Sequence, residues 1–171
     1  WIGFSVEIGP EGGVYILDWH DSDICGKRVL HPHTGRVFRI MPKDAKPIEQ
    51  PNLRALGDKE LVALQSHHNA WYARHARVLL AHRATTKKLD EGIVAELPAL
   101  FDKQETSPGR LRILWTQHVT GGTNEKMLMQ LLEHEDPYVR AWAVQLLCED
   151  RNASDAAVDK FAQMAKSDAS P

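Results

Sequence analysis

Hydrophobic and polar positions follow two different periods along the chain, and the change falls near residue 42. Before it, apolar and polar residues alternate in three short runs, FSVEIG, GGVYILDW and GRVFRI, each bounded by Gly, Pro or Asp. Alternation with a period of two is typical of strands. Residues 1–42 are therefore predicted to form a β segment of three strands, which make only a weak sheet by themselves.

The stretch MPKDAKPIEQPN has three prolines and no periodicity, which predicts an extended linker over residues 43–55. From residue 56 onward, apolar residues recur at the spacings of amphipathic helices. The pattern predicts helices near residues 58–66, 69–83, 89–103, 107–120, 123–134, 136–149 and 153–166. Pro98 should kink or split the third of them, because proline removes a backbone donor.

The helical part contains an internal repeat with a shift of 67 residues. HHNAWYARHARVLL falls on HEDPYVRAWAVQLL, so that His67 meets His134 and Asn69 meets Asp136. Asn69 and Asp136 stand where a helix N-cap is needed, and Pro137 follows at the favoured first helical position. A shift of this length corresponds to two helical hairpins.

Between the two copies lies SPGRLRILWTQHVTGG, in which Ser107 is predicted to cap a helix that Gly121 and Gly122 end. The apolar stripes of the helices predict the core. The residues expected to be buried are Leu64, Tyr72, Ala76, Leu79, Leu80, Leu114, Leu131, Val139, Ala143, Leu146 and Leu147.

The second copy of the repeat carries the pattern Asp-Pro-x-Val-Arg-x-x-Ala, and this pattern resembles the HEAT repeat family. Its members here are Asp136, Pro137, Val139, Arg140 and Ala143. The first copy departs from it, since Asn69-Ala70 replaces Asp-Pro and Arg74 comes one place late. The resemblance implies a mainly α fold, a HEAT-like α-solenoid of about seven helices preceded by the β segment.

The β segment has a resemblance of its own. GPEGGVYILDW resembles the Gly-Pro-x-Gly-x-x-Tyr-x-x-Asp-Trp element of sugar-dehydrogenase-like β-propellers. HTGRVFRI resembles the Gly-Arg-Ile-Tyr-Arg element that closes the last blade in large bacterial exported proteins, often labelled membrane-bound dehydrogenases. In that group the propeller is followed by HEAT-like repeats and then by a c-type haem domain.

The two resemblances together imply a division of the chain. Residues 1–42 would be the last strands of a propeller, 43–55 a proline-rich linker, and 56–171 a HEAT-like repeat domain. No Cys-x-x-Cys-His is present, so a c-type haem would lie elsewhere in a longer parent protein. The resemblance implies a periplasmic or extracellular location.

Composition narrows the functional classes. The net charge of −2 argues against a general nucleic-acid binder, and no apolar run is long enough to span a membrane. The chain has no Gly-x-Ser-x-Gly elbow, no phosphate-binding Gly-rich loop and no His-Glu-x-x-His helix. Cys25 and Cys148 are far apart in sequence, and we expect both to be free thiols.

The stretch DWHDSDICGKRVLHPH is the densest group of potential metal ligands, and its candidates are His20, Asp21, Asp23, Cys25, His31 and His33. A calcium EF-hand is excluded, because Pro32 stands where the bidentate Glu is required. A zinc site would use the cysteine and the histidines, but they lack paired ligand spacing. A polar loop between strands is favoured over a metal site or a substrate-contacting loop.

The helices carry two further groups of candidate binding residues. Trp71, Trp115 and Trp142 lie at or beside the apolar stripes, which favours packing over ligand stacking. A basic helical face that meets an acidic partner is one interpretation of the arginines, and a solvated face with ordinary ion pairs is the favoured one. These arginines are Arg74, Arg77, Arg83, Arg110, Arg112 and Arg140.

Two functions from different classes follow. The first is a non-catalytic interaction or spacer module that needs no cofactor and binds a protein partner or other domains of its parent chain. The second is part of a sugar- or alcohol-oxidising propeller, with residues 18–33 contributing to a substrate or metal site. Only the analogy of fold supports the second.

Overall fold

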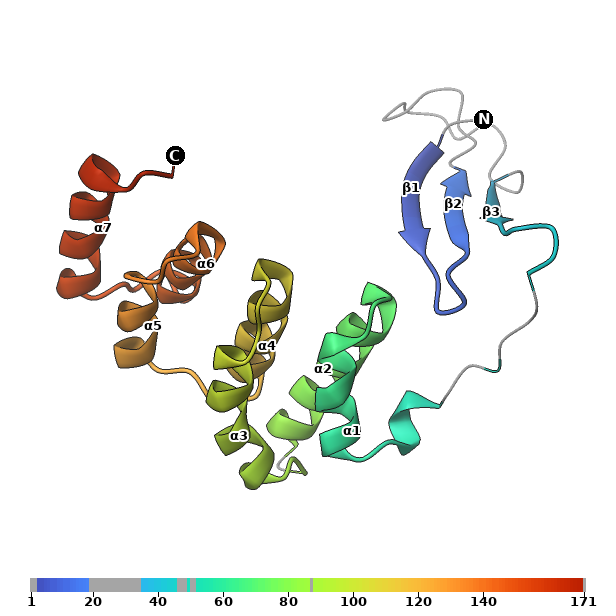
Figure 1. The fold of residues 1–171 in the computed structure, drawn as a ribbon, viewed down its shortest axis with the longest axis horizontal. Helices are drawn as coiled ribbons and strands as arrows, with labels where there is room; N and C mark the ends of the chain where they lie inside the picture. The colour runs from blue at the N-terminus through green and yellow to red at the C-terminus, as the bar shows by residue number, and fades with distance from the viewer. Residues whose placement is uncertain (1–2, 19–34, 46–48, 50–51, 87, 171) are drawn as a thin grey trace, which may run out of the picture.

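The structure, a computed structural model, describes residues 3–18, 35–45, 49, 52–86 and 88–170 of the 171-residue chain (Figure 1). It is mainly helical, with a small sheet at its N-terminal end. The strands are β1 (Gly3–Ile8), β2 (Val14–Asp18) and β3 (Arg36–Ile40). The α-helices are α1 (Asp58–Ala63), α2 (Ala70–Thr85), α3 (Glu91–Asp102), α4 (Ser107–Val119), α5 (Glu125–Leu131), α6 (Pro137–Leu147) and α7 (Asp155–Ser167). Two 3-10 helices are η1 (Leu53–Ala55) and η2 (Leu64–Ser66).

The three strands that the alternating pattern predicts are present, and they form one antiparallel sheet in the order β1-β2-β3. The turn between β1 and β2 is closed by a hydrogen bond of 2.9 Å from the Gly9 N–H to the Gly13 carbonyl. Gly12 lies in this turn at a φ of 82°, a conformation that side chains other than hydrogen disfavour.

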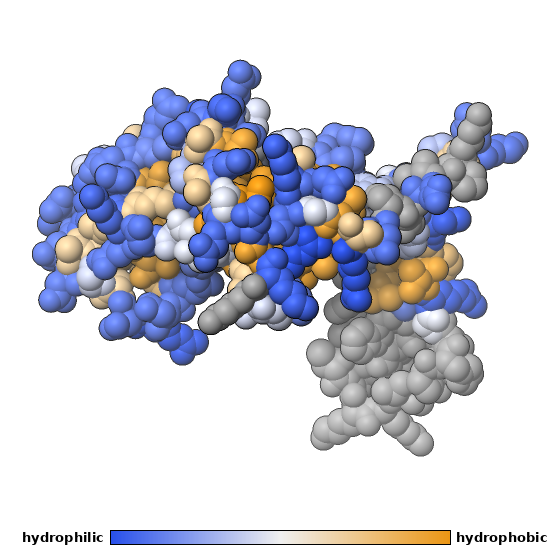
Figure 2. Space-filling view, turned by 90° about the horizontal axis from the view of Figure 1, so that it is seen from below, coloured by the Kyte–Doolittle hydropathy of each residue, from blue (hydrophilic) through white to orange (hydrophobic). Residues whose placement is uncertain are grey.

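The register of the sheet separates its two faces. One of them, called the apolar face below, consists of Val6, Ile8, Val14, Ile16, Phe38 and Ile40. Much of it is open to solvent, with Val6 67% and Ile40 56% exposed. Figure 2 shows hydrophobic residues gathered at this end of the molecule. The opposite face includes the charged residues Glu7 and Arg39.

The predicted helices all occur, with ends that differ by up to three residues from the prediction. The first predicted helix is only partly α-helical, because α1 ends at Ala63 and the 3-10 helix η2 follows it directly. The prediction that Pro98 kinks or splits the third helix was wrong as to splitting, since α3 runs unbroken through it. Because proline has no N–H, the carbonyl one turn before Pro98 loses its hydrogen bond within the helix. Pro98 is on the exposed side of α3, where water can bond that carbonyl instead.

The predicted caps of the repeat are confirmed. Asn69 Oδ1 accepts a hydrogen bond of 2.9 Å from the Trp71 N–H at the start of α2. Asp136 Oδ1 accepts one of 3.0 Å from the Tyr138 N–H at the start of α6, with Pro137 as the first helical residue. The cap predicted at Ser107 was one residue late. Thr106 has the extended backbone of an N-cap and accepts from the Gly109 N–H, so that α4 begins at Ser107.

The predicted stop at Gly121 and Gly122 is also confirmed. Gly121 has a φ of 78° and its N–H bonds the His118 carbonyl at 3.0 Å, while the Gly122 N–H bonds the Gln117 carbonyl at 2.8 Å. These are the two bonds of a Schellman motif, which requires the left-handed conformation that glycine adopts at least cost. The motif ends α4 and turns the chain toward α5.

The helices pack as consecutive pairs. α1 contacts α2, α3 contacts α4 and α5 contacts α6, and the second members of the pairs contact one another in the order α2, α4, α6. Figure 1 shows the pairs succeeding one another from the sheet toward the C-terminus. α5 and α6 begin 67 residues after α1 and α2 respectively, so the sequence repeat corresponds to a repeat of helix pairs.

One hydrophobic core runs through the pairs, and most of the predicted core residues belong to it. Tyr72, Ala76, Leu80, Leu114, Val139, Ala143 and Leu147 are buried as predicted. Four residues predicted to be buried are only partly buried against the core: Leu64, Leu79, Leu131 and Leu146. In the repeated helices the buried stripe advances by four residues, Tyr72, Ala76 and Leu80, and Leu79 lies at its edge.

The sheet contacts the helices at the beginning of α2. Asn69 Nδ2 donates to the Gly9 carbonyl at 2.9 Å and to the Pro10 carbonyl at 3.3 Å, which ties the β1–β2 turn to the N-cap of α2. Arg74 Nη2 lies 3.3 Å from Glu7 Oε2, and both side chains are more than half exposed. No described residue of the sheet belongs to the buried core, whose first member is Leu53.

The position of the core predicts that the helices fold without the sheet. Among the described residues, a variant that begins at Asn52 loses two hydrogen bonds at Asn69 and one exposed ion pair to the helices, but no buried core residue. We expect it to remain soluble, to keep the far-ultraviolet circular dichroism of helices and to melt cooperatively. Aggregation or a broad, non-cooperative melt would show that the sheet is part of the helical core.

Candidate binding surfaces

The predicted metal candidates lie outside the described residues. This applies to His20, Asp21, Asp23, Cys25, His31 and His33, so the choice between loop, metal site and substrate contact stays a prediction. In the ranges that the structure describes, no group of three His, Cys, Asp or Glu side chains is placed to hold a metal ion. Cys148 is an exposed free thiol, as predicted, and Cys25 lies among the residues that are not described.

The ligand spacing in residues 18–33 predicts no tight metal site. Elemental analysis of the purified chain should find less than stoichiometric zinc and calcium after dialysis. The His31→Ala and Asp21→Ala variants should therefore match the unaltered chain in metal content. Stoichiometric metal that either substitution removes would contradict the prediction and place a metal centre in this stretch.

A cleft of about 650 Å³ lies where the sheet meets the helices. β1 and the β1–β2 turn form one wall, with Val6, Glu7 and Ile8 along it. The other wall is the start of α2 and the residues before it, which contribute His67, His68, Asn69, Trp71 and Arg74. Its aromatic rings form a connected group, in which His67 stacks on His68 at 4.3 Å between centroids and Tyr72 contacts both His67 and Trp71.

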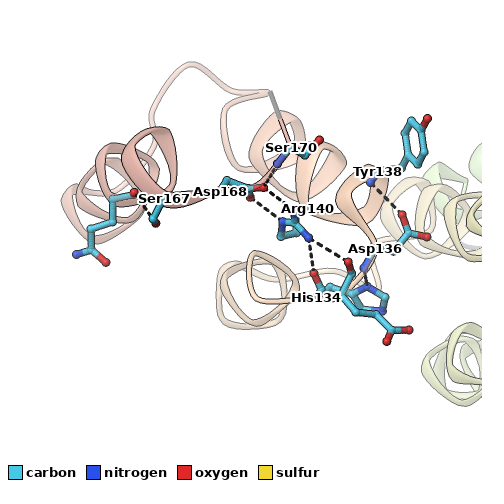
Figure 3. Close-up of polar contacts among 9 residues, drawn as sticks. His134, Asp136, Tyr138, Arg140, Ser167, Asp168 and Ser170 are labelled. Atoms are coloured by element: carbon cyan, nitrogen blue, oxygen red, sulfur yellow. Dashed lines mark hydrogen bonds and ion pairs between the residues drawn. The ribbon is translucent and has the colours of Figure 1, made fainter.

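The two histidines of the repeat have the same local role. His67 Nδ1 accepts a hydrogen bond of 3.0 Å from the Asn69 N–H. His134 Nδ1, which Figure 3 shows, accepts one of 2.9 Å from the Asp136 N–H. Each ring thus closes the turn that precedes a capped helix. Because Nδ1 is an acceptor in both, His67 and His134 use that nitrogen for the fold.

Arg140 holds the turn that precedes α6 in the second copy of the repeat, and it belongs to α6 itself. Its Nη1 donates to the His134 carbonyl at 2.9 Å and to the Glu135 carbonyl at 3.1 Å, while its Nε and Nη2 bond the Asp168 carboxylate (Figure 3). Such a bidentate pair is among the stronger hydrogen-bonded ion pairs of proteins. It joins α6 to the residue that follows α7, and it lowers the pKa of Asp168 through the hydrogen bond from Arg140.

The structure divides the six arginines of the predicted basic face into two groups of three. The arginines of the first group are mostly shielded from solvent and have carboxylate partners within the chain. Arg83 Nη1 lies 2.5 Å from Asp58 Oδ1, and Arg110 lies 3.3 Å from Glu135 Oε1 and 3.6 Å from Asp136 Oδ2. With Arg140 and Asp168, these are the intramolecular ion pairs that the favoured interpretation predicts.

The second group, Arg74, Arg77 and Arg112, gathers on α2 and α4 beside two tryptophans. Arg77 lies over the Trp115 ring with its guanidinium carbon 5.0 Å from the ring centroid. Trp115 in turn meets Trp142 of α6 edge-to-face at 4.8 Å. These five residues are called the arginine–tryptophan surface below. Arg77, Trp115 and Trp142 contact one another in turn across α2, α4 and α6, and the charges of Arg74 and Arg112 act on Arg77. Trp71, Trp115 and Trp142 are all partly buried against the core, which confirms the packing prediction.

Gln65 holds the two central arginines of this surface. Its side chain is 1% exposed, and its Nε2 donates to the Ala73 carbonyl at 3.1 Å. Its Oε1 accepts a bond of 3.2 Å from Arg77 Nη1, and its backbone carbonyl accepts one of 3.2 Å from Arg112 Nη1. Arg112 Nη1 also bonds the His67 carbonyl at 2.8 Å, the contact that Arg140 supplies in the second copy.

Like charges act on one another at this surface. Burial lowers the pKa of the Arg77 guanidinium, and the positive charges of Arg112 and Arg74 lower it further. Neither Arg77 nor Arg112 has a carboxylate within 4.0 Å among the described residues, and the partner of Arg74 is the exposed Glu7. Three arginines with one carboxylate partner among the described residues leave the surface with an excess of positive charge.

Neither the cleft nor the division of the arginines could be found by spacing alone. The cleft joins β1 to residues some sixty positions later, through the contact of Asn69 with the β1–β2 turn. His67 and His68 drew attention only as members of the repeat. Gln65 gave no signal, because a single glutamine before a predicted helix boundary has the pattern of a surface residue.

Comparison of the chain with protein-family models, with curated proteins and with solved structures finds no match. No helix in the part of the chain that the structure describes has the length and apolar character needed to cross a membrane.

Proposed function

We propose that the chain is a non-catalytic helical-repeat module, a HEAT-like solenoid that serves for protein interaction and as a spacer within a larger multidomain exported protein. The observation that carries the proposal is the order of the contacts, since each helix pair packs on the next and the second helices touch in sequence. The equivalent capping turns at His67 and His134 support a repeated structural unit. Stacked repeats of this kind present extended surfaces to partners.

The sheet supports the multidomain part of the proposal. Its apolar face exposes Val6, Ile8, Phe38 and Ile40, and soluble domains seldom leave such a face open. A further sheet of the same parent protein is the natural cover for it, as when blades pack face to face in a β-propeller. The sheet would then anchor the repeats to a propeller through the contact of its first turn with Asn69.

A pair of equivalent substitutions tests the repeat architecture. Leu80 and Leu147 occupy the same place in α2 and α6, with exposures of 0% and 8%. In a solenoid each unit depends mainly on its neighbours, so Leu147→Ala should reduce the hydrogen-exchange protection of α5 to α7 and leave that of α1 and α2 unchanged. Leu80→Ala should do the reverse.

The pair of variants supplies its own control, because each tests the end that the other leaves intact. Loss of protection in all helices to the same degree, in both variants, would show a single cooperative core and overturn the solenoid proposal. Turnover of sugars or alcohols by the purified chain, measured with a dye as electron acceptor, would overturn the non-catalytic part.

A further inference from the structure

At the arginine–tryptophan surface, Arg77 and Arg112 have guanidinium N–H groups that bond no described residue. The hydrogen bonds of Arg77 and Arg112 to described residues all use Nη1, and their acceptors are uncharged: the Gln65 side chain and the carbonyls of Gln65 and His67. The Nε and Nη2 edge of each guanidinium makes none of these bonds. That edge is the one with which Arg140 binds the Asp168 carboxylate in the same protein.

The two guanidinium groups are held in place without being neutralised. Gln65 is 1% exposed and hydrogen-bonded to the Ala73 carbonyl, so the groups that bind Arg77 and Arg112 are themselves fixed. Partial burial and the charge of Arg112 disfavour the charged form of Arg77, and an anion bound beside the two groups would compensate their charge. Preorganised, unneutralised arginines are suited to bidentate binding of a carboxylate.

The surroundings favour a protein ligand over a nucleic acid. The chain has a net charge of −2, and this surface has three arginines rather than the long basic face that a phosphate backbone requires. Trp115 lies against Arg77 and Trp142 lies against Trp115, and both rings offer apolar contact. Arginine and tryptophan side by side are typical of the residues that contribute most to protein–protein interfaces.

We propose that the arginine–tryptophan surface binds an acidic segment of a partner protein. A Glu or Asp carboxylate of that segment accepts hydrogen bonds from Arg77 and Arg112, and an adjacent apolar side chain packs against Trp115 and Trp142. The inference rests on the proposed function as an interaction module and names the surface and the chemistry of the partner.

Side-chain nuclear magnetic resonance of the full chain tests the contact directly. The probe is a peptide of alternating glutamates and leucines, and the control peptide has glutamine in place of glutamate. The glutamate peptide should shift the Nε–H resonances of Arg77 and Arg112 and leave that of the exposed Arg54 in place, and the glutamine peptide should shift none. Shifts of Arg54 equal to those of Arg77, or shifts with both peptides, would overturn the proposal.

Two charge-removing variants give the binding test a matched control. Arg77→Gln should weaken binding of the glutamate peptide about tenfold or more, whereas Arg54→Gln, which removes the same charge elsewhere, should leave it unchanged. Arg77 binds no backbone carbonyl, so its replacement should spare the fold, and unchanged circular dichroism checks this. Equal weakening by both variants, or tighter binding of single-stranded nucleic acid than of the peptide, would overturn the inference.

The two proposals fail in distinguishable ways. If the hydrogen-exchange test finds one cooperative core while the glutamate peptide still shifts Arg77, only the solenoid architecture is wrong. If protection is lost locally as expected but the peptide leaves Arg77 unmoved, only the carboxylate site is wrong.

Discussion

Replacing Leu114 with alanine is expected to lower the free energy of unfolding by about 2–5 kcal/mol. The side chain is 0% exposed in α4, and α4 is the helix that contacts both α2 and α6 as well as its own partner α3. The substitution leaves a cavity in the core, which the surrounding backbone can close only in part. Urea denaturation followed by circular dichroism measures the change.

Alanine substitutions at two more exposed apolar residues provide a comparison for the loss of stability in Leu114→Ala. Val119 lies in the same helix and is 36% exposed, so Val119→Ala should change the free energy of unfolding by no more than about 0.5 kcal/mol. Leu79, which is partly buried beside the core, should fall between the two. A Leu114→Ala cost as small as that of Val119→Ala would show that α4 does not occupy the centre of the core.

The elements of the fold could be predicted because their signals are local. Alternation fixed the three strands, and the caps at Asn69 and Asp136 fixed the starts of α2 and α6. The width of each buried stripe was harder to predict from the sequence. In α2 both Leu79 and Leu80 are apolar, and only the packing of neighbouring helices decides that Leu80 is at the centre and Leu79 at the edge. Apolar periodicity defines a face of a helix but leaves its width open.

The binding surfaces depend on contacts that no local pattern contains. Six arginines in amphipathic helices have the same appearance in sequence, yet Arg83 meets Asp58 across a distance of 25 residues while Arg77 meets Gln65. Whether an arginine is neutralised is settled by what the neighbouring helix presents. The first copy of the repeat illustrates this, because Ala73 stands where the second copy has Arg140, and Arg112 of the next pair supplies the missing contact to the turn.

The second large effect is expected at Asp136, which serves both α6 and its neighbour α4. Its side chain accepts from the Tyr138 N–H, and Arg110 of α4 lies 3.6 Å away. Asp136→Ala removes the cap and the ion pair together, and it should lower the free energy of unfolding at neutral pH by about 2 kcal/mol. Thermal or urea denaturation measures the loss, which should fall mainly on α5 to α7.

Protonation should imitate the substitution in acid. Burial alone would raise the pKa of Asp136, but hydrogen bonds from Ser107 and from the Tyr138 and Val139 N–H groups, together with the charge of Arg110, lower it below its ordinary value. A carboxylate whose pKa is lower in the folded than in the unfolded chain stabilises the fold above the unfolded value, about 3.9. That contribution is lost as the pH falls through the folded value.

The Asp136→Asn variant separates the cap from the charge. Asparagine caps α2 at the equivalent position, where Asn69 accepts from the Trp71 N–H, so Asp136→Asn should keep the cap and cost less than Asp136→Ala at neutral pH. Having no titrating group there, it should also approach the stability of the unaltered chain as the pH falls below about 4. A difference between the two proteins that stays constant from pH 7 to about pH 3 would show that the Asp136 charge contributes nothing to the fold.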